Sequence, residues 1–165
     1  MDVRILSYVQ DHCHNRFTDF LFPLLSRIGN AGAVWLTVAV CLGYQRRTRG
    51  LAFALFFSLA LSHVISQILK PVIGRPRPFV SFPGKRLLIH TPGGYSCPSG
   101  HSASSFAAAT VLWIFNNRLG AAALLLAVLI AFSRVFLFVH YPSDTIAGSL
   151  LGVLCAIFIL YLYKM

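Results

Sequence analysis

The sequence predicts an all-α integral membrane protein, a helical bundle of about five to six transmembrane helices. Of its 165 residues, 57% are hydrophobic and only 11% are charged, and the mean hydropathy is +0.73. The soluble core of so small a chain cannot bury that much apolar surface, so the bilayer must act as solvent. Several apolar runs also approach the ~20 residues that cross ~30 Å of hydrocarbon. One secretory signal followed by a soluble domain does not produce this pattern, and no cleavable targeting peptide is apparent.

Five apolar runs are predicted to cross the membrane. Short polar breaks separate most of them, and the one long loop, 71–97, follows the second run. The first run is short enough that its helix could begin earlier in the chain. The predicted spans are residues 31–44, 50–70, 99–116, 119–139 and 144–163.

Residues 1–30 are predicted to form an amphipathic N-terminal segment, while residues 31–165 form the membrane-embedded domain. Apolar residues recur in the segment at roughly helical spacing, but charged residues such as Arg4, Asp11 and Arg27 interrupt them. This mixture is typical of a helix pair lying in the membrane interface.

The charge balance is strongly basic and predicts the orientation. Fourteen Lys and Arg residues stand against four acids, and there is no Glu. The basic residues are spread over short loops between apolar runs, which favours anionic lipid headgroups as partners and argues against nucleic acid. One set of helix ends carries basic residues and is therefore predicted to be cytoplasmic. These residues are Arg46, Arg47, Arg49, Arg118 and Lys164.

The loop 71–97 consequently lies outside, although it and the preceding helix end are also basic. Topology does not explain this second basic cluster, whereas a binding site for an anion would. Its members are Lys70, Arg75, Arg77, Lys85 and Arg86.

The cysteines do not predict a metal site. Cys13, Cys41, Cys97 and Cys155 share no CxxC or CxxH spacing, so no zinc site is expected. Cys13 and Cys97 could both lie outside and pair, but two unpaired thiols are favoured.

The first candidate motif, K-P-V-I-G-R-P-R-P, begins at Lys70, where the second span ends. Its prolines and Gly74 prevent the helix from continuing and deliver Arg75 and Arg77 near Lys70. A juxtamembrane basic cluster that touches lipid phosphates is an equally good explanation for this motif alone.

The second motif, Pro98-Ser99-Gly100-His101, opens the third span. Unpaired backbone N–H groups at such a helix start form an anion site. Taken alone, the motif could equally be a helix cap with a histidine in the headgroup region.

The third motif runs from Ser133-Arg134 through His140 to Asp144. An arginine inside an apolar span is costly and usually functional. Arg134 and His140 converge only if the chain turns near Pro142, after which Asp144 can bond one imidazole nitrogen and leave the other to attack.

The predicted topology brings all three motifs to the outer face of the membrane. Three cationic side chains and helix N–H groups suit a phosphoryl group, whose transfer requires positioning and charge stabilisation. Metal-dependent phosphatases use several carboxylates, whereas Asp144 is the one acid after Asp19, so a metal mechanism is disfavoured and no cofactor is expected.

The combined motifs resemble the type 2 phosphatidic acid phosphatases, or lipid phosphate phosphatases, over about residues 50–164. The matching pattern is K-x6-R-P at Lys70, then P-S-G-H at Pro98, then S-R-x5-H-x3-D at Ser133. The short chain is typical of a bacterial or archaeal member without appended domains.

The resemblance implies a metal-independent hydrolase with a phosphohistidine intermediate. His140 is then the nucleophile, His101 protonates the leaving group and Asp144 orients His140. The implied phosphate ligands are Lys70, Arg77, Ser99, Gly100 and Arg134.

The sequence leaves the lipid open: undecaprenyl diphosphate, phosphatidylglycerol phosphate, phosphatidic acid and a lipid A phosphate all fit one phosphate pocket. The alternative of another class is a non-catalytic protein that binds anionic lipids or acts as a channel. His101, His140 and Asp144 argue against it, because anion binding alone needs neither the second histidine nor the aspartate. A transporter is disfavoured because the chain shows no inverted repeat. The oligomeric state is not predicted.

Overall fold

The computed structural model describes residues 1–85 and 87–163 and has helices throughout, with no strand in those ranges. The all-α prediction is confirmed. Arg86 and Lys164, which entered the charge argument, lie outside the described residues. The elements are α1 (Asp2–His12), α2 (Arg16–Ile28), η1 (Asn30–Gly32), α3 (Ala33–Tyr44), η2 (Arg46–Thr48), α4 (Arg49–Ile73), α5 (Pro78–Ser81), α6 (Gly100–Phe115), α7 (Asn117–Phe136) and α8 (Pro142–Leu162).

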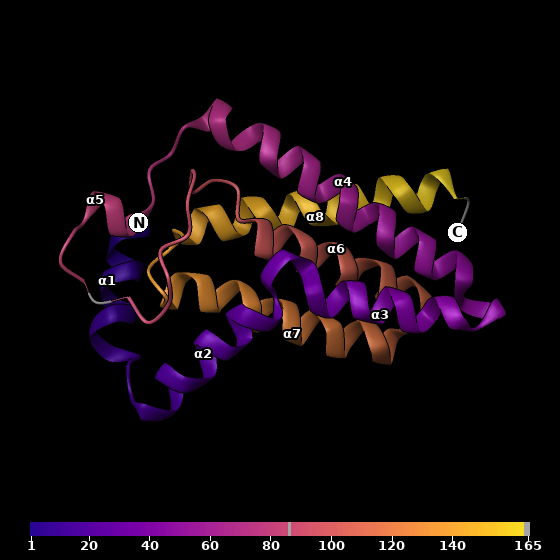
Figure 1. The fold of residues 1–165 in the computed structure, drawn as a ribbon, viewed down its shortest axis with the longest axis horizontal. Coiled ribbons are helices and arrows are strands. Elements are labelled where there is room, and N and C mark those ends of the chain that lie inside the picture. The colour runs from indigo at the N-terminus through magenta and orange to yellow at the C-terminus, as the bar shows by residue number, and fades with distance from the viewer. Residues whose placement is uncertain (86, 164–165) are drawn as a thin grey trace.

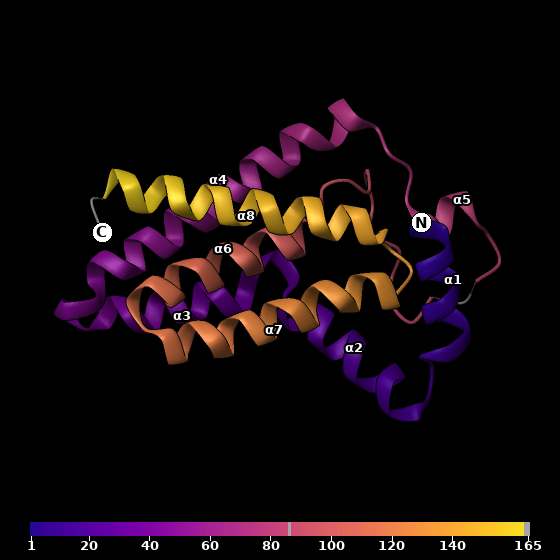
Figure 2. The same ribbon diagram turned by 180° about the vertical axis from the view of Figure 1, so that it is seen from behind.

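The helices α3, α4, α6, α7 and α8 run along the long axis of the molecule, and α6 lies at their centre against α4, α7 and α8 (Figures 1 and 2). Small side chains allow this position, since Ala103, Ala107 and Ala108 of α6 are fully buried. Gly148 and Gly152 of α8 face α6 so closely that an added Cβ would meet backbone oxygens of Ser99 and Ala103. Small residues at four-residue spacing let membrane helices approach in this way.

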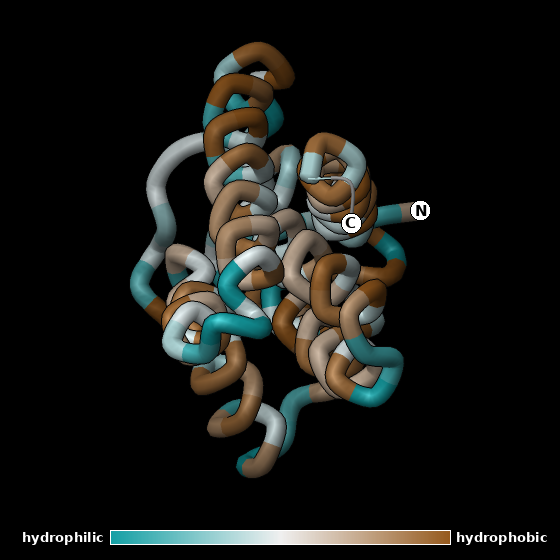
Figure 3. Tube along the Cα trace, turned by 90° about the vertical axis from the view of Figure 1, so that its right-hand side faces the viewer, coloured by the Kyte–Doolittle hydropathy of each residue, from teal (hydrophilic) through white to brown (hydrophobic). Residues whose placement is uncertain are grey.

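The outer surface of the bundle is apolar. Large hydrophobic side chains such as Phe53, Leu125 and Leu154 are more than half exposed. Figure 3 looks along the bundle and shows the α3–α4 and α6–α7 turns as hydrophilic segments at the end of largely hydrophobic helices. Such a surface suits lipid rather than water, and the chain is an integral membrane protein.

Among the residues that the structure describes, three segments are long and apolar enough to span a membrane, Arg46–Ser81, Asn117–Phe136 and Pro142–Leu162. A fourth is formed if Arg16–Ile28 and Asn30–Tyr44, bent by 49°, count as one span. Helices form at all five predicted ranges, although α6 has only 16 residues. The helix of the short first run, α3, begins at Ala33, and α2 precedes it across a kink at which Ala31 and Gly32 have positive φ.

The predicted span 119–139 extends too far, because α7 ends at Phe136. Phe138 adopts a φ of 60°, and the backbone N–H groups of Val139 and His140 both donate to the carbonyl of Arg134 at 3.2 Å. The sequence predicted a turn near Pro142, and the observed turn lies a few residues before that proline. It brings Arg134 and His140 together.

The N-terminal helices α1 and α2 pack on one end of the bundle, beside α7. The Gln10 amide donates to the Phe136 carbonyl at 2.7 Å, and the Phe22 and Phe136 rings pack in a tilted arrangement with centroids 4.5 Å apart. Apolar residues on one face, including Leu6 and Leu25, are buried, as an amphipathic pattern requires.

Candidate active site

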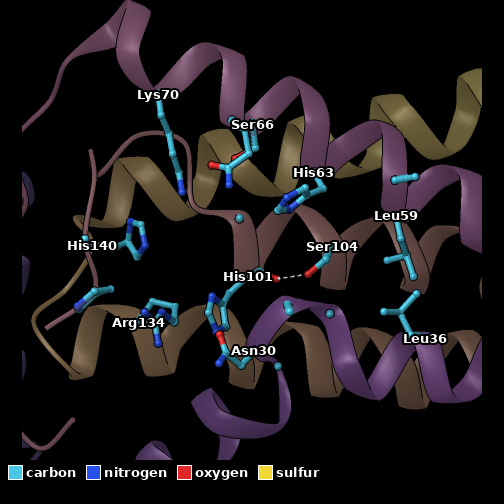
Figure 4. Close-up of a pocket in the computed structure, with 18 of the residues that line it drawn as sticks. Asn30, Leu36, Leu59, His63, Ser66, Lys70, His101, Ser104, Arg134 and His140 are labelled. Carbon is cyan, nitrogen blue, oxygen red and sulfur yellow. Dashed lines mark hydrogen bonds between the residues drawn. The ribbon is translucent and has the colours of Figure 1, made fainter. Parts of the chain in front are cut away.

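The three motifs meet at the end of the bundle that carries α1 and α5 (Figure 1). There, a pocket of about 540 Å³ opens between α3, α4, α6 and α7. The predicted site residues in its lining are Lys70, Arg77, Gly100, His101, Arg134 and His140. In Figure 4 the Lys70 side chain points from α4 toward His140, with Arg134 below.

Arg77 is fixed by backbone carbonyls. Its guanidinium donates to the carbonyls of Gly93, Gly94 and Val139, each at 3.0 Å. The residue is only 4% exposed. Because three carbonyls hold the planar guanidinium, a bound anion meets a charge already in place.

Arg134 is buried in α7 and is held from α2. One terminal nitrogen donates to the Ser26 hydroxyl. Its Nε is buried and has no hydrogen-bond partner among the described residues. An unpaired buried N–H costs about 1–3 kcal/mol, so this nitrogen favours a ligand that accepts hydrogen bonds.

The His140 ring has a defined tautomer. Its Nε2 lies 3.1 Å from a terminal nitrogen of Arg77. A guanidinium can only donate, so Nε2 carries the lone pair and Nδ1 carries the hydrogen. Burial, together with the nearby charges of Arg134 and Arg77, lowers the pKa of His140 to about 4. The imidazole is therefore neutral and nucleophilic at neutral pH.

Asp144 lies behind His140 but does not bond it directly. Its Oδ2 is 3.8 Å from His140 Nδ1, which is beyond hydrogen-bonding distance. The Ser96 hydroxyl stands beside both groups: it donates to Asp144 Oδ2 and lies 3.5 Å from His140 Nδ1. The Tyr141 backbone N–H also donates to Oδ2, at 2.9 Å.

The other Asp144 oxygen is held by Arg75, at 2.6 Å. Arg75 also donates to Asp2 of α1 at 2.8 Å and to the Ser143 hydroxyl at 2.7 Å. Its guanidinium lies 4.0 Å from the centroid of the Tyr141 ring. The carboxylate of Asp144 is fully buried, and these donors satisfy its charge.

His101 is positioned by the N-terminal helices. Its Nε2 lies 3.2 Å from the Ser26 carbonyl, so Nε2 carries a hydrogen and donates it. Ser26 therefore contacts both His101 and Arg134, the latter through its hydroxyl.

Ser99 caps α6 and is absent from the described pocket lining. Its hydroxyl accepts from the Ser102 N–H at 3.4 Å and from the Ser102 hydroxyl at 3.1 Å. Gly100, the first residue of α6, does line the pocket, and the helix N-terminus presents unpaired N–H groups there.

Ser26 and Ser96 were not predicted from the sequence, and Arg75 was predicted only as a member of the basic cluster. Ser96 stands two residues before Pro98, and Ser26 lies in the amphipathic segment. Neither belongs to a spacing pattern, so only their three-dimensional positions reveal them. The four described cysteines are free thiols.

Known proteins resemble this chain over most of its length. The sequence profile of the PAP2 superfamily matches residues 51–165. The chain belongs to the PAP2 superfamily. An undecaprenyl-diphosphatase from Sulfolobus acidocaldarius is 36% identical over 133 residues, which are 80% of this chain and 64% of that protein. A decaprenylphosphoryl-5-phosphoribose phosphatase from Mycolicibacterium smegmatis is 35% identical over 125 residues, 75% of this chain and 67% of that one.

The PAP2 fold is also shared with solved structures. The crystal structure of Aquifex aeolicus LpxE has a TM-score of 0.85 and 27% identity, covering 97% of this chain and 94% of that one. Some curated relatives are longer than this chain, which spans 64% of the Sulfolobus protein. The Bacillus licheniformis bacitracin transport permease protein BcrC is 33% identical over 105 residues, which are 61% of this chain and 52% of that protein.

Proposed function

We propose that this chain hydrolyses a phosphate or diphosphate ester of a membrane lipid, without a metal, through a phosphohistidine on His140. The observation that carries the proposal is the pocket itself. Three cationic side chains line it together with His101 and His140, and the unprotonated nitrogen of His140 faces the cation of Arg77.

The cationic end of the pocket supports a phosphoryl group as ligand. Lys70, Arg77 and Arg134 provide positive charge, and the described lining contains no Asp or Glu. A phosphate oxygen on the unpaired Nε of Arg134 would satisfy that buried donor. Charge-assisted bonds to guanidinium groups are the contacts that stabilise a phosphoryl group in transfer.

In the first step, Nε2 of His140 attacks phosphorus. The N–P bond forms while the bond from phosphorus to the leaving oxygen breaks, and His101 gives that oxygen a proton. Because Nε2 of His101 donates to the Ser26 carbonyl, Nδ1 is the nitrogen that exchanges this proton. His101 therefore enters the first step as the imidazolium, with hydrogen on both nitrogens, and becomes neutral when the leaving oxygen takes the Nδ1 proton. Asp144 and Ser96 stabilise the positive charge that develops on the His140 ring.

In the second step, water attacks the phosphohistidine. His101 now accepts a proton from the water, the N–P bond breaks, and inorganic phosphate leaves. The cations hold the equatorial oxygens in both transition states. Lys70, Ser99 and the Gly100 amide are the remaining proposed phosphate ligands, with Ser99 acting through the helix cap.

The proposed substrate is a lipid because the pocket opens among membrane helices and becomes apolar away from the cations, at Leu36 and Leu59 (Figure 4). The names of the similar proteins, which include polyprenyl diphosphate and polyprenyl phosphoribose phosphatases, favour the same class. The positive-inside rule supports an extracytoplasmic position for the site as part of the proposal.

A phosphate-release assay tests the function. Purified protein in detergent is offered polyprenyl diphosphate, phosphatidylglycerol phosphate, phosphatidic acid and lipid A, beside the His140→Ala and Arg134→Ala variants. We expect release from at least one lipid, loss of turnover in His140→Ala, and a decrease of about 10²-fold or more in Arg134→Ala. Full activity in a folded His140→Ala protein would refute the mechanism, and a protein inactive on every lipid would favour a non-catalytic lipid-binding role.

A further inference from the structure

Between its cationic and apolar ends, the pocket has a polar middle section. In Figure 4, Lys70, Arg134 and His140 lie at one end and Leu36 and Leu59 at the other. The middle section consists of His63, Ser66 and Gln67 of α4, with Asn30 and Ser104 across the pocket. The proposed catalytic residues include none of these five.

The middle section is continuous with the phosphate site along one face of α4. His63, Ser66, Gln67 and Lys70 follow the spacing i, i+3, i+4, i+7, which places them on the same side of a helix. Seven residues correspond to about 10 Å along the axis. The section therefore extends from Lys70 toward the apolar end over the length of a polar headgroup.

Ser66 gives a direct sign that the section binds a ligand. Its side chain lines the pocket, the residue is 1% exposed, and its hydroxyl has no hydrogen-bond partner among the described residues. The preceding buried serine on the helix differs, because the Ser62 hydroxyl donates to the Leu59 carbonyl at 3.0 Å. A hydroxyl that is buried and unpaired costs free energy that an acceptor on a ligand would recover.

The position of His101 shows which part of the substrate the section meets. His101 is the proposed acid for the leaving oxygen, so groups between His101 and the apolar end contact the leaving group. A leaving group that is hydrocarbon from its first carbon would bury these polar side chains without hydrogen-bond partners. The section offers hydroxyl, imidazole and amide donors, and no carboxylate lies in the described lining.

We propose that this polar middle section is a binding subsite for a second phosphate group of the lipid, on the leaving-group side of the scissile bond. The inference rests on the proposed function and names its substrate class. The second phosphate is either attached directly, as in a polyprenyl diphosphate, or separated by a glycerol, as in phosphatidylglycerol phosphate. Ser66, His63 and Gln67 donate hydrogen bonds to its oxygens.

The test compares kcat/KM of the wild type and of the Ser66→Ala, His63→Ala and doubly substituted proteins on three lipids. Two lipids carry a second phosphate, the polyprenyl diphosphate and phosphatidylglycerol phosphate, and phosphatidic acid does not. We expect the double variant to lose about 10- to 100-fold on at least one lipid with two phosphates, the range for charge-assisted hydrogen bonds, and less than about threefold on phosphatidic acid. Which of the two lipids loses activity identifies the spacing of the phosphates.

Ser62→Ala is the matched control, because it removes a buried α4 hydroxyl that does not line the pocket. This variant should leave the ratio of kcat/KM between the lipids unchanged. Equal losses on all three lipids, or no loss on any, would overturn the subsite. Competition by methylene diphosphonate against phosphate gives a second measurement, since the variants should weaken inhibition by the diphosphonate alone. If the wild type releases phosphate from no lipid, the proposed function fails instead.

Discussion

The contact between α6 and α8 permits a quantitative prediction for Gly152→Ala. A Cβ at residue 152 would lie 2.1 Å from the Ala103 carbonyl oxygen and 2.9 Å from the Ala107 nitrogen. Real Cβ atoms keep about 3 Å or more from such atoms. The obstacle is backbone, so no change of rotamer relieves it, and α6 and α8 must separate by about 1 Å.

The separation should reach the active site, because α6 begins at Gly100 beside His101 and α8 begins two residues after His140. Overpacking of this kind costs about 1–3 kcal/mol of stability, and a misplacement of about 1 Å lowers catalysis by about 10²-fold. We therefore expect Gly152→Ala to lower the melting temperature in detergent and to reduce kcat/KM by about two orders of magnitude.

The assay measures phosphate release and thermal unfolding on the same monodisperse fraction, with helix content checked by circular dichroism. Gly50→Ala is the control, because a Cβ at Gly50 of α4 meets nothing within 4 Å and alanine favours a helix by about 1 kcal/mol. Wild-type activity and stability in Gly152→Ala would refute the reasoning that this close helix contact sets the geometry of the site.

Three further predictions follow from the site. Activity should survive EDTA, because the described pocket lining has no carboxylate to hold a divalent ion, and strict magnesium dependence would contradict this expectation. Vanadate should inhibit as a mimic of the transition state. Ser96→Ala should lower kcat about 10-fold or more with little change in KM, since it removes the hydroxyl between Asp144 and His140, and an unchanged kcat would exclude that role. The ring nitrogens of His140, assigned by comparison with His140→Gln, should titrate in NMR near pH 4 in the ligand-free protein. Because burial lowers the pKa, the ring becomes charged only as the pH falls through that value. A titration midpoint near pH 6.5 would instead show that the ring is exposed.

Much of the fold could be predicted because apolar helices in a bilayer are encoded locally. Each of the five runs has the length and hydropathy of a helix, and helices formed at all of them. Their ends were less certain: α7 stops at Phe136, since the turn that holds Val139 and His140 depends on the Arg134 carbonyl. The bent continuity of α2 with α3 was also left open, because a kink at Ala31 carries no proline signal.

By itself, the sequence determined the membrane class, the three motifs and their meeting at one end of the bundle, because span order and charge bias follow from local composition. Only the tertiary structure decided which neighbours complete the site. Ser96 stands between Asp144 and His140, Ser26 contacts Arg134 and His101, and Arg75 links Asp144 to Asp2 of the first helix. These contacts join residues far apart in the chain, and local composition does not encode which distant side chains become neighbours.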